Sequence, residues 1–192
     1  AQRPSGGRMM LGRIAGMIAM HQGAVMLRQQ AESWSKHGAA VRHARAVGKP
    51  MLVVGGPYGS GVSGRLLGMK AHGCGDMCAD IDPDSCRGCP FVLADVRDLP
   101  WPDGYFGACL CPHVLEHLET LAEIDRAWGE LHRVADGVYT CFPGKDSFAG
   151  WMAPGHHLWV KELGSGILDV QQRGGLRRRD LIVARARAAA TS

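Results

Sequence analysis

The chain has 192 residues, 46 % of them hydrophobic and 21 % charged, which is enough for one α/β domain with a core and an appendage. Its formal net charge of +4 comes with arginines gathered near both ends, and only 6 % of residues are aromatic, so there is no clear nucleic-acid signature. Seven cysteines, an odd number, argue against a secreted disulfide framework and predict a cytoplasmic protein.

The first predicted element is helical and covers residues 8–28, a stretch apolar enough to suggest a signal peptide or a membrane span. Arg13 and His21 argue against a span, because charge is costly in hydrocarbon, and no cleavage pattern follows. Several side chains recur at helical spacing on one face: Ile14, Met17, Ile18, His21 and Val25. We expect this amphipathic helix to pack on its own domain or a second subunit, with contact to a membrane surface through residues 9–27 as the alternative.

Helical pattern continues over residues 33–46 and stops at Gly48-Lys49-Pro50, a natural boundary. The sequence therefore predicts an N-terminal helical extension over residues 1–48 and an α/β domain over residues 49–192.

Within the second region, short apolar stretches alternate with helical ones. We expect strands at 51–54, 76–81, 90–93, 105–111, 137–142 and 180–184, and helices at 62–72 and 119–134. This alternation predicts a doubly wound, mostly parallel Rossmann-like sheet.

The glycine-rich turn after the first strand has several interpretations. GSGVSG, residues 59–64, satisfies the dinucleotide pattern G-x-G-x-x-G, with Asp80 or Asp82 at a suitable distance for a ribose, although the strand ends early for it. A P-loop is excluded because no Lys-Ser or Lys-Thr follows the glycines. The remaining readings are a tight turn without a ligand and a turn whose glycines, Gly55, Gly56 and Gly59, let the backbone approach a nucleoside.

Residues 94–118, ADVRDLPWPDGYFGACLCPHVLEHL, carry a family resemblance. They resemble the class I S-adenosylmethionine-dependent methyltransferases, in particular the small type 11-like group with a D-x-x-x-L-P-F-P-D-x-x-F-D motif followed by H-V-L-E-H. The resemblance covers about residues 50–184 and implies a Rossmann-like fold with S-adenosylmethionine as cofactor.

The resemblance also implies roles for individual residues. Asp80 would accept hydrogen bonds from the ribose hydroxyls, Asp95 with the Val96 backbone would read the adenine amino edge, and Ile81 would pack on the ring. Cys111 and His113 would line the methionine end. The cofactor-binding set is Gly55, Gly56, Gly59, Asp80, Ile81, Asp95, Val96 and Cys111, and the candidates for a catalytic base are His113, Glu116 and His117.

Three departures from the family pattern leave two hypotheses for function. Val53 stands where the family carries an acid, Pro57 stands at a motif glycine, and Phe106-Gly107 replaces Phe-Asp. The first hypothesis is a methyltransferase for a small or lipid-like acceptor, which suits the apolar N-terminal helix. The alternative is a catalytically degenerate binding or assembly module in which Val53 and Pro57 obstruct the cofactor site.

Four cysteines surround the second predicted strand with the spacing C-x3-C-x7-C-x2-C. Only residues 83–90 separate this strand from the next, too few for the usual helical crossover, so the loop needs a brace. We expect four thiolates, from Cys74, Cys78, Cys86 and Cys89, to bind one structural zinc ion there. The alternative is four buried or free thiols.

Overall fold

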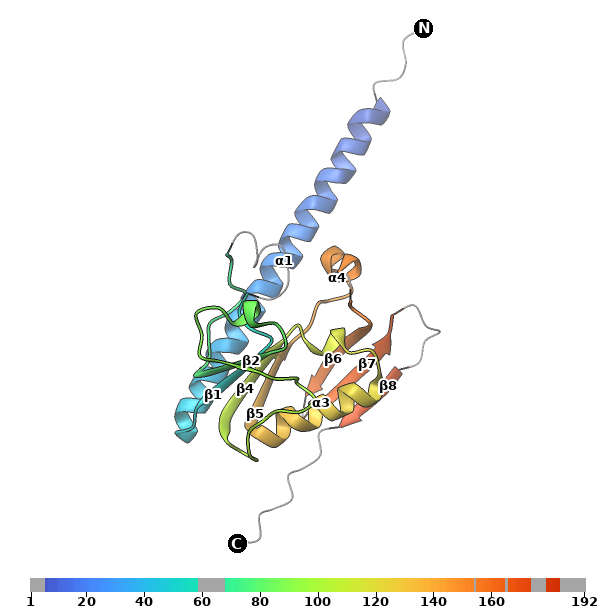
Figure 1. Cartoon of the computed structure of the whole chain (residues 1–192). Helices are drawn as coiled ribbons and strands as arrows, with labels where there is room; N and C mark the ends of the chain where they lie inside the picture. The colour runs from blue at the N-terminus through green and yellow to red at the C-terminus, as the bar shows by residue number, and fades with distance from the viewer. Residues whose placement is uncertain (1–5, 59–67, 154, 165, 174–178, 184–192) are drawn as a thin grey trace.

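The computed structural model describes residues 6–58, 68–153, 155–164, 166–173 and 179–183 (Figure 1). Five parallel strands form its central sheet in the order β3-β2-β1-β4-β5. Their bounds are β1 Met51–Val54, β2 Met77–Asp80, β3 Phe91–Leu93, β4 Phe106–Pro112 and β5 Ala135–Cys141. The strand order reverses between β1 and β4, so the predicted doubly wound, Rossmann-like sheet is confirmed.

The central strands are apolar because both of their faces are covered. All four residues of β1 and all seven of β4 are buried. Alternate side chains enter two separate cores: Leu52 and Cys109 pack with helix α3, whereas Val53 and Leu110 pack with helix α1. Strands buried on both faces show continuous apolar runs instead of alternation, as the sequence has here.

Helix α3, Leu121–Val134, covers one face of the sheet. Thr120 caps its N-terminus through the backbone N–H of Glu123, and the Glu123 carboxylate accepts in return from the Thr120 backbone. Its buried side is a regular helical stripe: Ile124, Ala127, Trp128, Leu131 and Val134. This stripe fixes how the helix lies on the sheet.

Helix α1, Gly6–Val47, covers the opposite face with its C-terminal part, where Ala40 and Ala44 are buried. Its N-terminal part projects away from the domain (Figure 1). Ile14, Met17 and Ile18 are 40 %, 58 % and 58 % exposed, so this part of the helix does not pack on its own domain. The other expected arrangement, packing on a second subunit, stays a prediction. No helix among the described residues has the length and apolar character that a membrane crossing needs.

The last three strands form a separate antiparallel sheet in the order β6-β7-β8. They span Leu158–Gly164, Ile167–Gln172 and Arg179–Val183. The final strand expected at residues 180–184 is therefore present, but it pairs with β7 and not with the parallel sheet. Leu158, Leu168 and Ile182 join the α3 core, which attaches this sheet to the domain.

The helix expected at residues 62–72 is only partly testable, because residues 59–67 lie outside the described part of the chain. Residues 68–72 are not helical. His72 is buried in this segment, and its Nδ1 lies 2.9 Å from the Gly73 carbonyl oxygen. Burial lowers the pKa of His72 to about 4.

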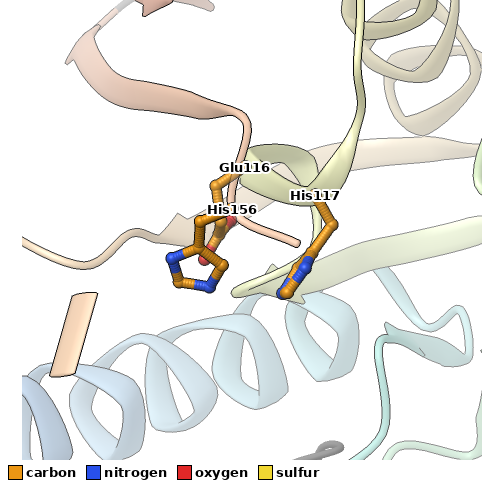
Figure 2. Close-up of side chains that lie close together, drawn as sticks. All are labelled: Glu116, His117 and His156. Atoms are coloured by element: carbon orange, nitrogen blue, oxygen red, sulfur yellow. The ribbon is translucent and has the colours of Figure 1, made fainter. Parts of the chain in front are cut away.

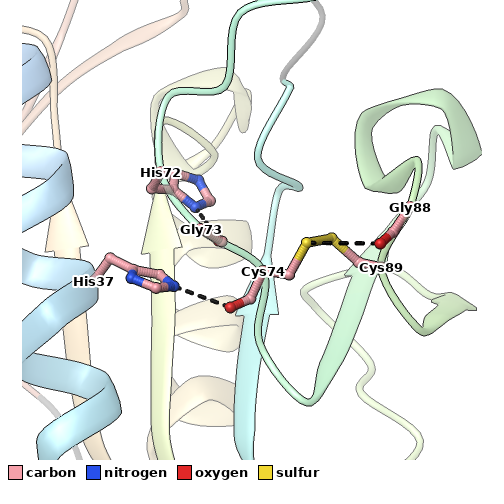
Figure 3. The surroundings of a disulfide bond; sticks show 6 residues. All are labelled: His37, His72, Gly73, Cys74, Gly88 and Cys89. Atoms are coloured by element: carbon pink, nitrogen blue, oxygen red, sulfur yellow. Dashed lines mark hydrogen bonds between the residues drawn. A yellow bond between two sulfur atoms is a disulfide. The ribbon is translucent and has the colours of Figure 1, made fainter.

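The connection from β2 to β3 is short, as predicted, and contains one 3-10 turn, η1, Pro83–Cys86. A disulfide between Cys74 and Cys89 closes it (Figure 3). Cys78 and Cys86 are buried free thiols, and the pKa of Cys86 is raised by its hydrogen bond with Cys78 and by burial.

This arrangement does not support the predicted four-cysteine zinc site. Sulfurs joined to each other carry no thiolate charge, and zinc is bound by thiolates. Among the described residues, the four cysteines also do not form a cluster close enough to hold a metal ion. The disulfide supplies the brace that the shortened connection was expected to need.

Replacing both Cys74 and Cys89 with Ser is expected to lower the free energy of unfolding by about 3 kcal/mol, because the bond closes a loop of 15 residues. Guanidinium unfolding of both forms, with and without reductant, measures this difference. Reductant should weaken the unaltered chain and leave the double variant unchanged. Equal midpoints for the two proteins under oxidising conditions would contradict the bond, as would more than five alkylatable thiols in the denatured chain.

Candidate functional site

A cavity of about 410 Å³ lies beyond the carboxyl ends of the parallel strands. Its wall consists of Val54, Gly55, Asp80, Ile81, Asp82, Ser85, Ala94, Asp95, Val96, Arg97, His113, Val114, His117, Leu118, Glu119 and Glu123. These residues follow β1, β2, β3 and β4, next to the point where the strand order reverses. This is the place where open α/β sheets bind their ligands.

Most residues predicted for the site line this cavity: Gly55, Asp80, Ile81, Asp95, Val96, His113 and His117. Gly56 lies just behind the wall and is buried. Cys111 is fully buried inside β4 and does not line the cavity. Its place at the methionine end stays a prediction that this burial does not favour. Burial raises the pKa of the Cys111 thiol. Gly59 lies outside the described residues.

The turn after β1 needs glycine at two successive positions. Gly55 has φ 94° and Gly56 has φ 50°, values that side chains disfavour. A Cβ at Gly55 would lie 2.3 Å from Cγ2 of Val114, a cavity residue. A Cβ at Gly56 would lie 2.3 Å from the backbone oxygen of Ser85. The turn is therefore held tightly against η1 and the segment after β4.

Asp80 is the last residue of β2 and lines the cavity. Its Oδ1 accepts a hydrogen bond from the backbone N–H of Asp82 at 2.9 Å. Burial raises the pKa of Asp80, although this hydrogen bond acts in the opposite direction. A carboxylate at the end of the second strand, oriented by its own backbone, is well placed to accept hydrogen bonds from a diol.

Asp95 is held by an arginine that the sequence interpretation missed. Nε of Arg97 donates to Oδ1 of Asp95 at 2.9 Å, and Nη2 donates to Oδ2 at 2.5 Å. The other end of the guanidinium pairs with Glu123 at the start of α3. The Arg97 hydrogen bonds lower the pKa of Asp95. The signal was a basic residue two positions after the acid.

Val53 and Pro57, the two departures from the family pattern, do not line the cavity. Val53 is fully buried in the core on the α1 side of the sheet, and Pro57 is buried in the turn. The obstruction that the degenerate-module hypothesis expected from these residues is not found in the described structure.

Three histidines lie close to Glu116 at one side of the cavity, and Figure 2 shows two of them, His117 and His156. Glu116 lies in η2, Leu115–His117, and is completely buried. His113 has a positive φ of 54°, which is strained for a side chain of this size, and its Nδ1 lies 3.3 Å from Oε1 of Glu116. Burial acts to lower the pKa of His113, but the contact with Glu116 outweighs it and the pKa is raised.

The third histidine, His156, comes from the segment before β6, and its association with Glu116 was not predicted. Its ring centroid lies 4.5 Å from that of His117, with the two rings nearly perpendicular. The backbone N–H of the next residue, His157, donates to the Glu116 carbonyl at 2.9 Å. This hydrogen bond joins η2 to the segment before β6.

The strand order and the cavity at the carboxyl ends of the strands define a Rossmann-like α/β domain. The family model for the methyltransferase domain, Methyltransf_11, matches residues 59–138. The resemblance to class I S-adenosylmethionine-dependent methyltransferases, expected from residues 94–118, is thereby confirmed. No curated protein matches the sequence significantly.

Solved structures similar to this chain have low sequence identity. A complex of the Haloferax volcanii Trm112 methyltransferase activator with a methyltransferase described as putative matches at 16 % identity and TM-score 0.32, over 60 % of this chain and 55 % of that chain. PH0226 from Pyrococcus horikoshii matches at 16 % identity and TM-score 0.39, over 75 % of this chain and 73 % of that chain. The N-methyltransferase NodS from Bradyrhizobium japonicum, in complex with S-adenosylhomocysteine, matches at 15 % identity and TM-score 0.34. This match covers 53 % of this chain and 56 % of that chain.

Proposed function

We propose that this chain is an S-adenosylmethionine-dependent methyltransferase that acts on a small or lipid-like acceptor. One observation carries the proposal: Gly55, Asp80 and Asp95, which follow three neighbouring strands, line one cavity. When bound, the cofactor supplies a sulfonium methyl group that is already activated for direct displacement. The protein then has to hold the cofactor, align the acceptor and receive a proton where the acceptor loses one.

The described residues fit a nucleoside cofactor. Asp80 offers a partly buried carboxylate to two ribose hydroxyls, and Asp95 is held in one orientation by Arg97. Ile81 lines the cavity with a side chain that is 73 % exposed, an apolar surface that a purine ring would cover. At Gly55 the absence of a side chain lets the turn lie directly against Val114 at the cavity wall.

His113 is our candidate for the general base, because it lines the cavity and contacts a buried carboxylate. The Glu116 carboxylate, 3.3 Å away, stabilises the imidazolium that forms when His113 takes a proton. His117 lines the same wall and is the second candidate.

The alternative of a binding or assembly module is favoured by one feature, the projecting part of α1. Its exposed apolar residues include Met10, Leu11, Met17 and Ile18, which offer a surface to a partner or to a lipid-like acceptor. A structural zinc does not enter the proposal, because two of its four expected ligands form a disulfide. The cytoplasmic location stays a prediction.

Calorimetric titration of S-adenosylhomocysteine into the purified full chain tests the proposal. We expect saturable binding with one site and a dissociation constant in the micromolar range. The nicotinamide dinucleotide NAD serves as the control ligand and should not bind, since the strand ends too early for the dinucleotide pattern. Absence of binding by the folded protein would overturn the methyltransferase proposal and favour the assembly module.

A further inference from the structure

We propose that Glu116, His117 and His156 form a binding site for a divalent transition-metal ion. One carboxylate oxygen and one ring nitrogen from each histidine lie within 4.8 Å of one another (Figure 2). This is the only such group among the described residues. Two of the residues come from η2 and the third from the segment before β6, 39 positions later in the chain.

Glu116 is the first reason to infer an ion. Its side chain is completely buried, and neither carboxylate oxygen has a hydrogen-bond partner among the described residues. The contact with His113 at 3.3 Å is close enough for an ion pair but lacks hydrogen-bond geometry. A buried carboxylate whose oxygens accept no hydrogen bond is costly, and such groups normally gain hydrogen bonds or coordinate a metal.

The histidine tautomers are the second reason. Nδ1 of His117 lies 3.1 Å from the Gly155 carbonyl oxygen, and Nδ1 of His156 lies 3.3 Å from the Gly150 carbonyl oxygen. A carbonyl oxygen can only accept, so Nδ1 carries the proton in both hydrogen bonds. In the neutral rings the lone pair then lies on Nε2. Metal-binding histidines are typically fixed in this way by a backbone carbonyl.

The surrounding backbone holds the three ligands in place. The His157 N–H to Glu116 carbonyl hydrogen bond joins the two segments, and Arg173 donates to the His156 carbonyl at 3.0 Å. The Arg173 guanidinium also stacks on Trp159, with its carbon 5.1 Å from a ring centroid. These contacts fix the position of the His156 segment against the buried Glu116, whereas the His117 side chain is exposed.

Two imidazoles with one carboxylate suit zinc or iron(II), which leave further coordination positions open with such a set. His117 also lines the 410 Å³ cavity, so the ion would lie at its wall. An ion there occupies His117 and leaves His113 as the base of the proposed methyl transfer.

Titration of Zn²⁺ into the full chain, in buffer without reductant so that the disulfide stays intact, tests the site. We expect one zinc per chain. Glu116→Gln and His156→Ala should each weaken binding by more than the roughly 10- to 100-fold that loss of an outer hydrogen-bond partner costs. His157→Ala is the matched control, because it removes the neighbouring histidine and should bind zinc like the unaltered chain. No saturable binding, or binding equally affected or equally unaffected in all three variants, would overturn the site.

Thermal unfolding separates metal binding from a merely structural role of Glu116. Without metal, Glu116→Gln should unfold at about the same temperature as the unaltered chain, because loss of the His113 ion pair offsets the removal of a buried charge whose oxygens accept no hydrogen bond. Zinc should raise the unfolding temperature of the unaltered chain and leave that of Glu116→Gln unchanged. A Glu116→Gln variant that unfolds earlier without metal and is still stabilised by zinc would overturn the proposal.

The spectrum of bound Co²⁺ identifies the ligands. Coordination by nitrogen and oxygen gives only the weak visible bands of the ion, whereas thiolate coordination adds an intense near-ultraviolet charge-transfer band. We expect the first spectrum, lost in His156→Ala. A thiolate band would place the metal at cysteines and overturn the assignment to these three residues. These measurements use no S-adenosyl ligand, so their outcome is independent of the cofactor titration.

Discussion

The Asp80→Ala variant is expected to bind S-adenosylhomocysteine on the order of 100-fold more weakly than the unaltered chain. Hydrogen bonds to a charged group contribute roughly 1.5–3 kcal/mol each, and the proposed ribose contact uses two of them. A net loss of about 3 kcal/mol corresponds to that factor, since each 1.4 kcal/mol is tenfold. Isothermal titration calorimetry of both proteins measures it.

Asp84→Ala is the matched control for this measurement. Asp84 is an exposed acid in η1, four positions after Asp80, and does not line the cavity. It removes the same charge from the same connection, so its affinity for S-adenosylhomocysteine should stay within about twofold of the unaltered value. Equal weakening in both variants would show a general effect of charge. An unchanged affinity in Asp80→Ala would exclude Asp80 from the binding site.

The Gly56→Ala variant is expected to lower the free energy of unfolding by about 2–5 kcal/mol. A left-handed backbone costs roughly 1–2 kcal/mol with a side chain, and overpacking adds about 1–3 kcal/mol. Here the new Cβ would meet the Ser85 backbone oxygen at 2.3 Å, and a backbone atom cannot rotate away. Urea unfolding measures the change. The cavity should also lose affinity for S-adenosylhomocysteine, because relief of the clash moves the turn away from η1.

Gly48→Ala controls for the backbone conformation alone. Gly48 follows α1 with φ 67°, and a Cβ there would meet no heavy atom within 4 Å. We expect only the left-handed cost of roughly 1–2 kcal/mol and an unchanged cavity. If both variants lose equal stability, then the contact with Ser85 contributes nothing.

Local pattern predicted the sheet and the acidic part of the site. Strands β1 and β4 are short apolar runs bounded by turn residues. A few consecutive residues are therefore enough to predict each of them from the sequence. Parallel strands place their carboxyl ends at one edge, so an acid that follows such a strand has a predictable location. The family resemblance assigned Asp80 and Asp95 to the site, both lie at such strand ends, and both line the cavity.

Contacts between distant segments were not predictable because no local periodicity encodes them. The β6-β7-β8 sheet depends on strand pairing, and only its last strand was expected, in the wrong sheet. Arg97 reaches Glu123 across 26 positions to hold Asp95. The exposure of the N-terminal part of α1 was likewise not predictable. The same apolar face could be buried against the domain or left exposed, and only the packing of the domain decides between them.

The four cysteines around β2 and the group of Glu116, His117 and His156 show most clearly what the sequence predicts and what only the folded structure decides. Spacing indicated that the β2–β3 connection needs a brace, but it could not distinguish a metal from a bond, because that choice depends on which sulfurs meet. The tertiary structure joined Cys74 to Cys89 and left Cys78 and Cys86 as buried free thiols in contact with each other. In the same way, H-V-L-E-H determined that Glu116 and His117 are neighbours, whereas only folding brought His156 to them from a distant segment.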